Sequence, residues 1–167
     1  SSVAYAGENY PTILIGNQCW LAKNLNVGTM IQWTLGSANQ SNDGIIEKFC
    51  YNDNLSNCGI YGGLYQWAEA VQYQNGASNS ASPSPAFTGN VRGICPSGWH
   101  LPSGIELGSL VNNVGGASTA GSALKSTSSL WLSYPLNSNF SGFSALPAGN
   151  YNYNGFFFGL GDETSFL

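Results

Sequence analysis

The 167-residue chain has few charged residues: only 7% are Asp, Glu, Lys or Arg, against about 25% in a typical domain. Its four Lys and Arg residues cannot form the basic stripe that neutralises nucleic-acid phosphates. They also cannot form a polybasic segment that binds an anionic membrane surface. With eight Asp and Glu residues, the net charge is −4. The sequence therefore predicts no nucleic-acid partner.

Long hydrophobic runs are also lacking. Runs such as Phe156–Phe158 fall far short of the roughly 18 apolar residues of a membrane-spanning helix, so no direct membrane insertion is expected. Disorder is not expected either, because 43% of the residues are hydrophobic and 13% are aromatic. The length suits one domain of about 100–200 residues, and we predict a single domain over residues 1–167.

Recognisable catalytic and metal-binding patterns are scarce. His100 is the one histidine, so any Ser-His-Asp or Cys-His mechanism would have to use it, and we interpret it as structural. The adjacent pair Asp162-Glu163 suggests a surface turn. The segment Asn52–Asn54 resembles part of a calcium loop, but no closing Glu follows at the required spacing. We predict no catalytic residue, no bound metal and no cofactor.

The four cysteines suggest an oxidising compartment and two disulfides. Four cysteines allow three pairings. Cys50–Cys58 is favoured because the two residues are close in sequence, and Cys19–Cys95 then follows by elimination. Four buried thiols are the alternative.

Hydrophobic periodicity predicts two main helices. Leu64, Trp67, Ala68 and Val71 define a helix over 63–72. The second helix, over 103–114, begins with a Ser-x-x-Glu capping box at Ser103. A short third helix is expected over 120–126, and a long loop is expected over 74–94.

Short β-type runs surround these helices, and together they predict an α+β fold with mostly antiparallel strands. The expected strands cover residues 10–16, 18–22, 31–34, 49–51, 143–146 and 150–161. Asn154-Gly155 is a strong hairpin signal within the last of these, because both residues accept a positive φ.

The alternation of Asn and Tyr before this turn suggests a binding surface. Aromatic rings beside amides suit sugar rings or protein partners. An ordinary hairpin with a half-buried tyrosine pair is the alternative. The candidate ligand-binding residues are Asn150, Tyr151, Asn152, Tyr153, Asn154 and Phe156.

Four ordered segments resemble motifs of the Fibrobacter succinogenes major paralogous domain family. They are Gln18–Asn26, Cys50–Asp53 with Tyr61–Trp67, Cys95–Ser103, and Gly142–Gly149. The resemblance implies a prokaryotic, extracellular or cell-surface domain related to the C-type lectin-like fold.

The resemblance also implies a function. We expect a non-enzymatic recognition or adhesion domain that binds a glycan or protein ligand. A structural subunit of a pilin-like surface filament is the alternative, and a polysaccharide-acting enzyme is the third hypothesis. No catalytic residue is established for the family, so none is transferred to this chain.

The chain departs from the family's pattern after the hairpin. Family members continue with a Trp- and Ser-rich segment and a final cysteine-containing strand, whereas this sequence stops at Leu167. We therefore expect the last strands to be missing, with an unpaired sheet edge available for self-association. In relatives Cys95 could pair with the late cysteine, which leaves the Cys19–Cys95 pairing open.

Overall fold

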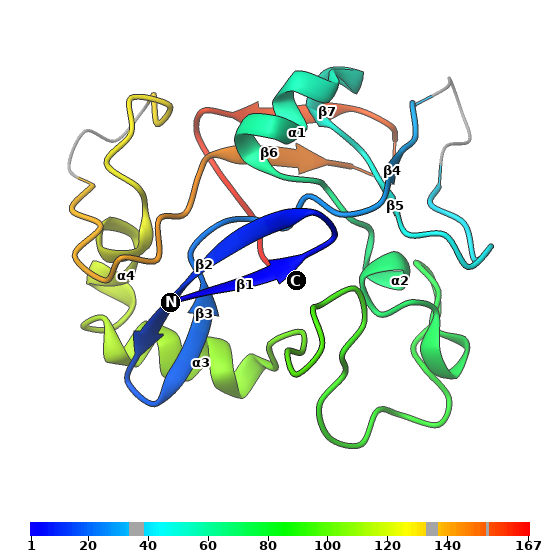
Figure 1. The fold of residues 1–167 in the computed structure, drawn as a ribbon, viewed down its shortest axis with the longest axis horizontal. Coiled ribbons are helices and arrows are strands. Elements are labelled where there is room, and N and C mark those ends of the chain that lie inside the picture. Colours follow the sequence, from blue (N-terminus) through cyan, green and yellow to red (C-terminus); the bar gives the residue numbers. More distant parts are fainter. Residues whose placement is uncertain (34–38, 133–136, 153) are drawn as a thin grey trace. The chain divides into compact units, whose positions relative to one another are not determined.

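The computed structural model describes residues 1–33, 39–132, 137–152 and 154–167. Its mixture of helices and short sheets is compatible with the predicted α+β class (Figure 1). The strands along these residues are β1 Ser2–Tyr5, β2 Glu8–Ile15, β3 Gln18–Leu21, β4 Thr29–Met30, β5 Glu47–Lys48, β6 Ala148–Tyr151 and β7 Phe157–Leu160. The helices are α1 Leu55–Tyr61, α2 Trp67–Ala70, α3 Gly104–Asn113 and α4 Ala117–Leu124, with 3₁₀ turns at Tyr51–Asp53 and Gln74–Gly76.

These residues divide into two compact units, each made of discontinuous segments. The first, here called the helix–sheet unit, comprises Ser1–Leu25, Ser103–Asn150 and Phe158–Ser165. The second, here called the disulfide unit, comprises Asn26–Pro102, Tyr151–Phe157 and Phe166–Leu167. The length of the chain suggests that the two units form one domain, and this stays a prediction.

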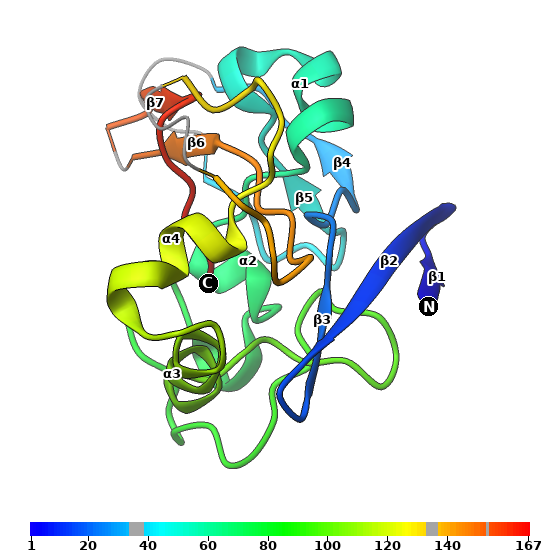
Figure 2. The same ribbon diagram turned by 90° about the vertical axis from the view of Figure 1, so that its left-hand side faces the viewer.

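The helix–sheet unit contains a three-stranded antiparallel sheet in the order β1-β2-β3 (Figure 2). Alternation along β2 buries Ile15 and leaves its neighbour Leu14 exposed. The predicted strands over 10–16 and 18–22 correspond to β2 and β3, whereas β1 was not predicted. In this sheet β1 has a strand on one side only.

Two helices and the segment that contains Phe143 and Ala145 supply the rest of this unit's core. The predicted capping box is confirmed: the backbone N–H of Ser103 donates to Glu106 Oε2 over 2.8 Å, and Glu106 N–H donates to Ser103 Oγ over 3.3 Å. The next helix, α4, begins before the expected position 120. The buried cluster consists of Ile15, Leu110, Val114, Ala120, Ala123, Phe143 and Ala145.

The helix predicted over 63–72 is wrong at its beginning. Leu64 and Phe49 exchange both backbone hydrogen bonds, at 2.9 and 3.0 Å, so the chain is extended there. Only α2 is helical within the predicted range. An unpredicted helix, α1, precedes it and begins after Asn54, whose side chain accepts a hydrogen bond from the N–H of Ser56.

Three other expected strands are shorter or displaced. In place of 31–34 and 49–51, the structure has β4 and β5, which pair in parallel rather than antiparallel. Thr34 lies outside the described residues. Within 143–146 the only strand-like pairing described is an isolated parallel bridge between Lys125 and Ala145.

The predicted hairpin is present as β6 and β7, which form a two-stranded sheet and run in opposite directions (Figure 1). Within the expected 74–94 loop, Gln74–Gly76 forms a 3₁₀ turn, and residues 77–94 contain neither helix nor strand. No helix among the described residues is long and apolar enough to cross a membrane.

Candidate functional site

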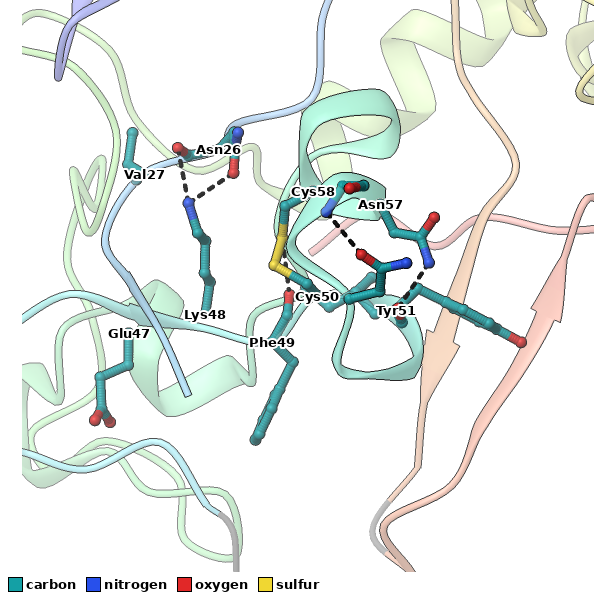
Figure 3. The surroundings of a disulfide bond; sticks show 12 residues. Asn26, Val27, Glu47, Lys48, Phe49, Cys50, Tyr51, Asn57 and Cys58 are labelled. Carbon is teal, nitrogen blue, oxygen red and sulfur yellow. Dashed lines mark hydrogen bonds between the residues drawn. A yellow bond between two sulfur atoms is a disulfide. The ribbon is translucent and has the colours of Figure 1, made fainter. Parts of the chain in front are cut away.

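The disulfide unit contains the predicted Cys50–Cys58 disulfide, with an S–S distance of 2.00 Å (Figure 3). The enclosed segment is also held by hydrogen bonds: Asn57 Nδ2 donates to the carbonyl of Tyr51 over 2.8 Å. Figure 3 shows the Tyr51 side chain pointing away from the disulfide. The bond and α1 together hold one of the segments that line the site described below.

The expected Cys19–Cys95 disulfide is not formed, because both residues are free thiols. Cys19 faces solvent on β3, opposite the exposed Leu14 of β2, while its neighbour Trp20 turns to the other face. Cys95 is buried, and burial raises the pKa of its thiol to about 11. Elimination would require every cysteine to be paired, and Cys19 and Cys95 are not.

A pocket of about 360 Å³ lies in the disulfide unit. Its walls come from three separate segments: the residue shortly after β4, the 3₁₀ turn after Cys50, and the turn that joins β6 to β7. The lining residues are Trp33, Asn52, Asp53, Gly155, Phe156 and Phe157. The pocket therefore combines aromatic rings with one carboxylate and one amide side chain.

The carboxylate of Asp53 is oriented by the pocket itself. The backbone N–H of Trp33 donates to Asp53 Oδ1 over 2.9 Å, and the N–H of Asp53 donates to the carbonyl of Cys50 over 2.8 Å. Asn52 and Asp53 both have left-handed backbone conformations, with φ of 54° and 53°, which Asn and Asp tolerate better than most residues. This turn presents both polar side chains at the pocket.

Aromatic packing forms the remaining wall. The rings of Trp33 and Phe156 have centroids 5.8 Å apart, yet Phe156 is 60% exposed. Gly155 has a φ of 84°, and a Cβ there would collide with Trp33 Nε1. Glycine is therefore required at this position for both its backbone conformation and its close approach to the indole.

Phe157, which lines the pocket, also belongs to a group of packed aromatic rings. Tyr151 lies between Phe49, at 4.3 Å, and Phe157, at 5.1 Å between centroids, and Phe157 also contacts Tyr51 at 5.3 Å. Burial raises the pKa of Tyr151, and the negative charge of Asp53 adds to the effect. Tyr151 thus supports the hairpin from inside the unit.

The predicted binding residues occupy different positions. Phe156 lines the pocket, whereas Tyr151 belongs to the ring stack and Asn154 is exposed in the turn. Asn152 Oδ1 accepts hydrogen bonds from the N–H groups of Asn154 and Phe156, at 3.1 and 3.0 Å, and thus shapes the turn. Asn150 is in β6. Tyr153 lies outside the described residues.

The sequence analysis missed Trp33 and Asp53 as site residues. It placed Trp33 in an expected strand and Asp53 in a segment that resembles part of a calcium loop. The signals present were the cysteine pair, which marks a closed loop, and the helix-capping Asn54 that follows Asp53. No sequence pattern connects Trp33 with the cysteine pair or with Asn54.

A second polar feature of this unit is the buried acid Glu69, which is 0% exposed. Its Oε1 accepts hydrogen bonds from the N–H of Glu47, at 3.1 Å, and from Gln72 Nε2, at 2.9 Å. Burial raises the pKa of this carboxyl group above its ordinary value. Glu69 lies outside the residues that line the pocket.

His100 and the Asp162-Glu163 pair are not among the residues that line the pocket. His100 Nδ1 lies 3.4 Å from Asn90 Nδ2, and Asp162-Glu163 follows β7 in a turn. Over the described ranges, no three His, Cys, Asp or Glu side chains come together in a way that could hold a metal ion.

A sequence model of the Fibrobacter succinogenes major domain matches residues 13–166. This match spans nearly the whole chain, so the protein belongs to that family, as its motifs indicate. No curated protein and no solved structure matches the chain.

Proposed function

We propose that this member of the Fibrobacter succinogenes major domain family is a non-enzymatic recognition domain of the cell surface or extracellular space, with a C-type lectin-like fold. Its ligand is a glycan or a protein, bound at the pocket lined by Trp33, Asp53 and Phe156. The observation that carries the proposal is an aromatic pocket whose carboxylate is already oriented by a backbone hydrogen bond.

The size and chemistry of the pocket support binding. Ligand pockets commonly enclose about 300–1,000 Å³ and combine apolar walls with a few placed polar groups. An exposed aromatic ring such as Phe156 offers a large rigid contact area with little entropy to lose on binding. The low overall charge suits recognition by shape and short-range contacts.

Two further observations support this proposal. The Cys50–Cys58 disulfide is compatible with an oxidising, extracellular location. The pocket has one carboxylate among its lining residues, whereas polysaccharide hydrolases generally use two. Ligand binding without chemistry is the simplest use of such a site.

The experiment that tests the proposal is an array of glycans and surface proteins probed with the whole chain and two variants. Phe156→Ala removes the exposed pocket ring, and we expect binding to the preferred ligand to weaken about tenfold or more, as for a central aromatic contact. Phe140→Ala is the matched control, because Phe140 is 67% exposed but belongs to the helix–sheet unit.

The proposal is wrong if the folded protein binds nothing on the array. It is equally wrong if the two variants lose the same amount of binding, because the ligand would then not depend on the pocket. Circular dichroism of each variant establishes that the loss is not caused by unfolding.

A further inference from the structure

We propose that the pocket takes an organic cation, an alkylammonium or guanidinium group, held by the carboxylate of Asp53 and the faces of the Trp33 and Phe156 rings. This inference rests on the proposed function and names the ligand chemistry of the same site. Four observations support it: the charge balance of the chain, the orientation of Asp53, the nature of the pocket walls and an internal example of the same contact.

Among the described residues, the charge balance leaves Asp53 without a cationic partner. The chain has four cationic side chains, and each is engaged elsewhere. Lys23 pairs with Glu8 at 2.6 Å, Lys48 donates to Asn26, Arg92 donates to the carbonyl of Cys95, and Lys125 lies over the ring of Trp131. Within the described part of the chain, no cation pairs with Asp53.

The orientation of Asp53 is set before a ligand arrives. The N–H of Trp33 occupies one position on Oδ1, and an ionised carboxylate has about four acceptor positions in all. The remaining positions can accept hydrogen bonds from an ammonium or guanidinium group. Since the carboxylate is already held, a ligand loses less ordering entropy on binding.

The pocket walls favour a cation over a neutral sugar. A sugar ring presents several hydroxyl groups, and each needs a donor or acceptor when it is buried. Phe156 and Phe157 offer neither, which leaves Asn52 and Asp53 as the main polar side chains. A cation needs only the carboxylate and the negative faces of the rings, of which Trp is the best. The net charge of −4 further favours a positively charged ligand.

The same contact already occurs within this protein. In the helix–sheet unit, Lys125 Nζ lies 4.1 Å from the centroid of the Trp131 ring. The pocket has an indole at Trp33 together with the carboxylate of Asp53. A cation from another molecule would therefore find the same ring interaction with an added ion pair.

The test is an NMR titration of the whole chain with butylguanidinium and butylammonium, compared with neutral butylurea at the same concentrations. We expect the two cations to shift the Trp33 indole N–H and the Phe156 amide in a saturable manner. Butylurea, which is similar in size and shape to butylguanidinium, should not. The cation affinity should fall with rising salt, because the pair at Asp53 is screened.

Two matched variants isolate the charge. Asp53→Asn keeps an oxygen for the Trp33 N–H but removes the negative charge, so we expect the cation affinity to fall about tenfold. Asp162→Asn makes the same change in net charge outside the pocket and should leave the affinity unchanged. Equal effects of the two variants, or equal shifts with butylurea, would overturn the inference.

Further measurements distinguish the possible sources of the cation, and they distinguish the cation inference from the proposed recognition function. Binding of acetyl-arginine-amide as well as butylguanidinium supports a protein side chain as the source, and binding of the free cations alone supports a small molecule. If binding to the array ligand is lost in Phe156→Ala but kept in Asp53→Asn, the cation inference is wrong and the proposed recognition site is retained. Cation binding without any array ligand would support the cation and count against macromolecular recognition.

Discussion

The two units of this protein are stabilised in different ways. In the helix–sheet unit, α3, α4 and the three-stranded sheet bury a cluster that is aliphatic except for Phe143. The disulfide unit has shorter elements, and its buried residues include the polar side chains of Gln40, Lys48 and Glu69. Its one described disulfide closes the segment Cys50–Cys58.

In the disulfide unit, side chains form hydrogen bonds with backbone groups that neighbouring strands would pair in a sheet. Gln40 Nε2 donates to the carbonyls of Glu47 and Leu64, each at 3.1 Å, and Gln40 Oε1 accepts from the N–H of Gln66 at 2.6 Å. Buried backbone groups must be paired, and here an amide side chain pairs them. In this unit, a buried amide side chain therefore joins backbone segments that no regular sheet connects.

The largest expected effect comes from the aliphatic core. Leu110 is 3% exposed and sits in the cluster beneath α3, so Leu110→Ala should lower the free energy of unfolding by about 3 kcal/mol. Ile105→Ala is the control on the same helix, because Ile105 is 86% exposed. Urea denaturation measures the loss, and hydrogen exchange locates it. Equal loss of protection in both units would contradict the separation of their stabilising contacts.

A smaller effect is expected from the disulfide. Replacing both Cys50 and Cys58 by Ser opens a short loop, and the chain-entropy argument predicts a loss of about 2.5 kcal/mol. Hydrogen exchange should report the loss mainly in α1 and the 3₁₀ turn before it. Cys19→Ser changes an exposed free thiol and serves as the control. Undiminished protection of α1 in the double variant would show that hydrogen bonds alone hold this segment.

The smallest effect concerns Glu69 and depends on pH. Because burial raises the pKa of its carboxyl group, the folded chain holds the proton more tightly than the unfolded chain does. The resulting stability is complete below the ordinary pKa of 4.5 and is lost as pH rises through the raised pKa. Glu69→Gln stays neutral, so its stability should vary less between about pH 4 and about pH 8.

Urea midpoints over that pH range measure the effect, with Glu163→Gln as a control carboxyl in the helix–sheet unit. The expectation fails if the wild type and Glu69→Gln have parallel pH profiles. It also fails if Glu163→Gln flattens the profile as much, since burial of Glu69 would then not be the cause.

Local signals predicted the elements whose causes are local. The Ser103 capping box located α3, and Asn154-Gly155 located the hairpin. The helix over 63–72 was predicted with the wrong start because Leu64 pairs with Phe49, a partner that helical periodicity cannot reveal. The candidate site was harder still, since only Phe156 among the predicted residues that the structure describes lines the pocket. Its carboxylate is positioned by a backbone N–H twenty residues away, which no short motif encodes.

Asp53 lies inside the segment that the Cys50–Cys58 bond closes. When the two thiols are reduced, that segment has more conformations to lose, and a ligand must supply the ordering free energy that the disulfide otherwise provides. The oxidation state of Cys50 and Cys58 would therefore change the affinity of the proposed pocket, although the pocket itself contains no sulfur. If the proposed ligand binds at this pocket, the reduced chain should bind it more weakly than the oxidised chain does.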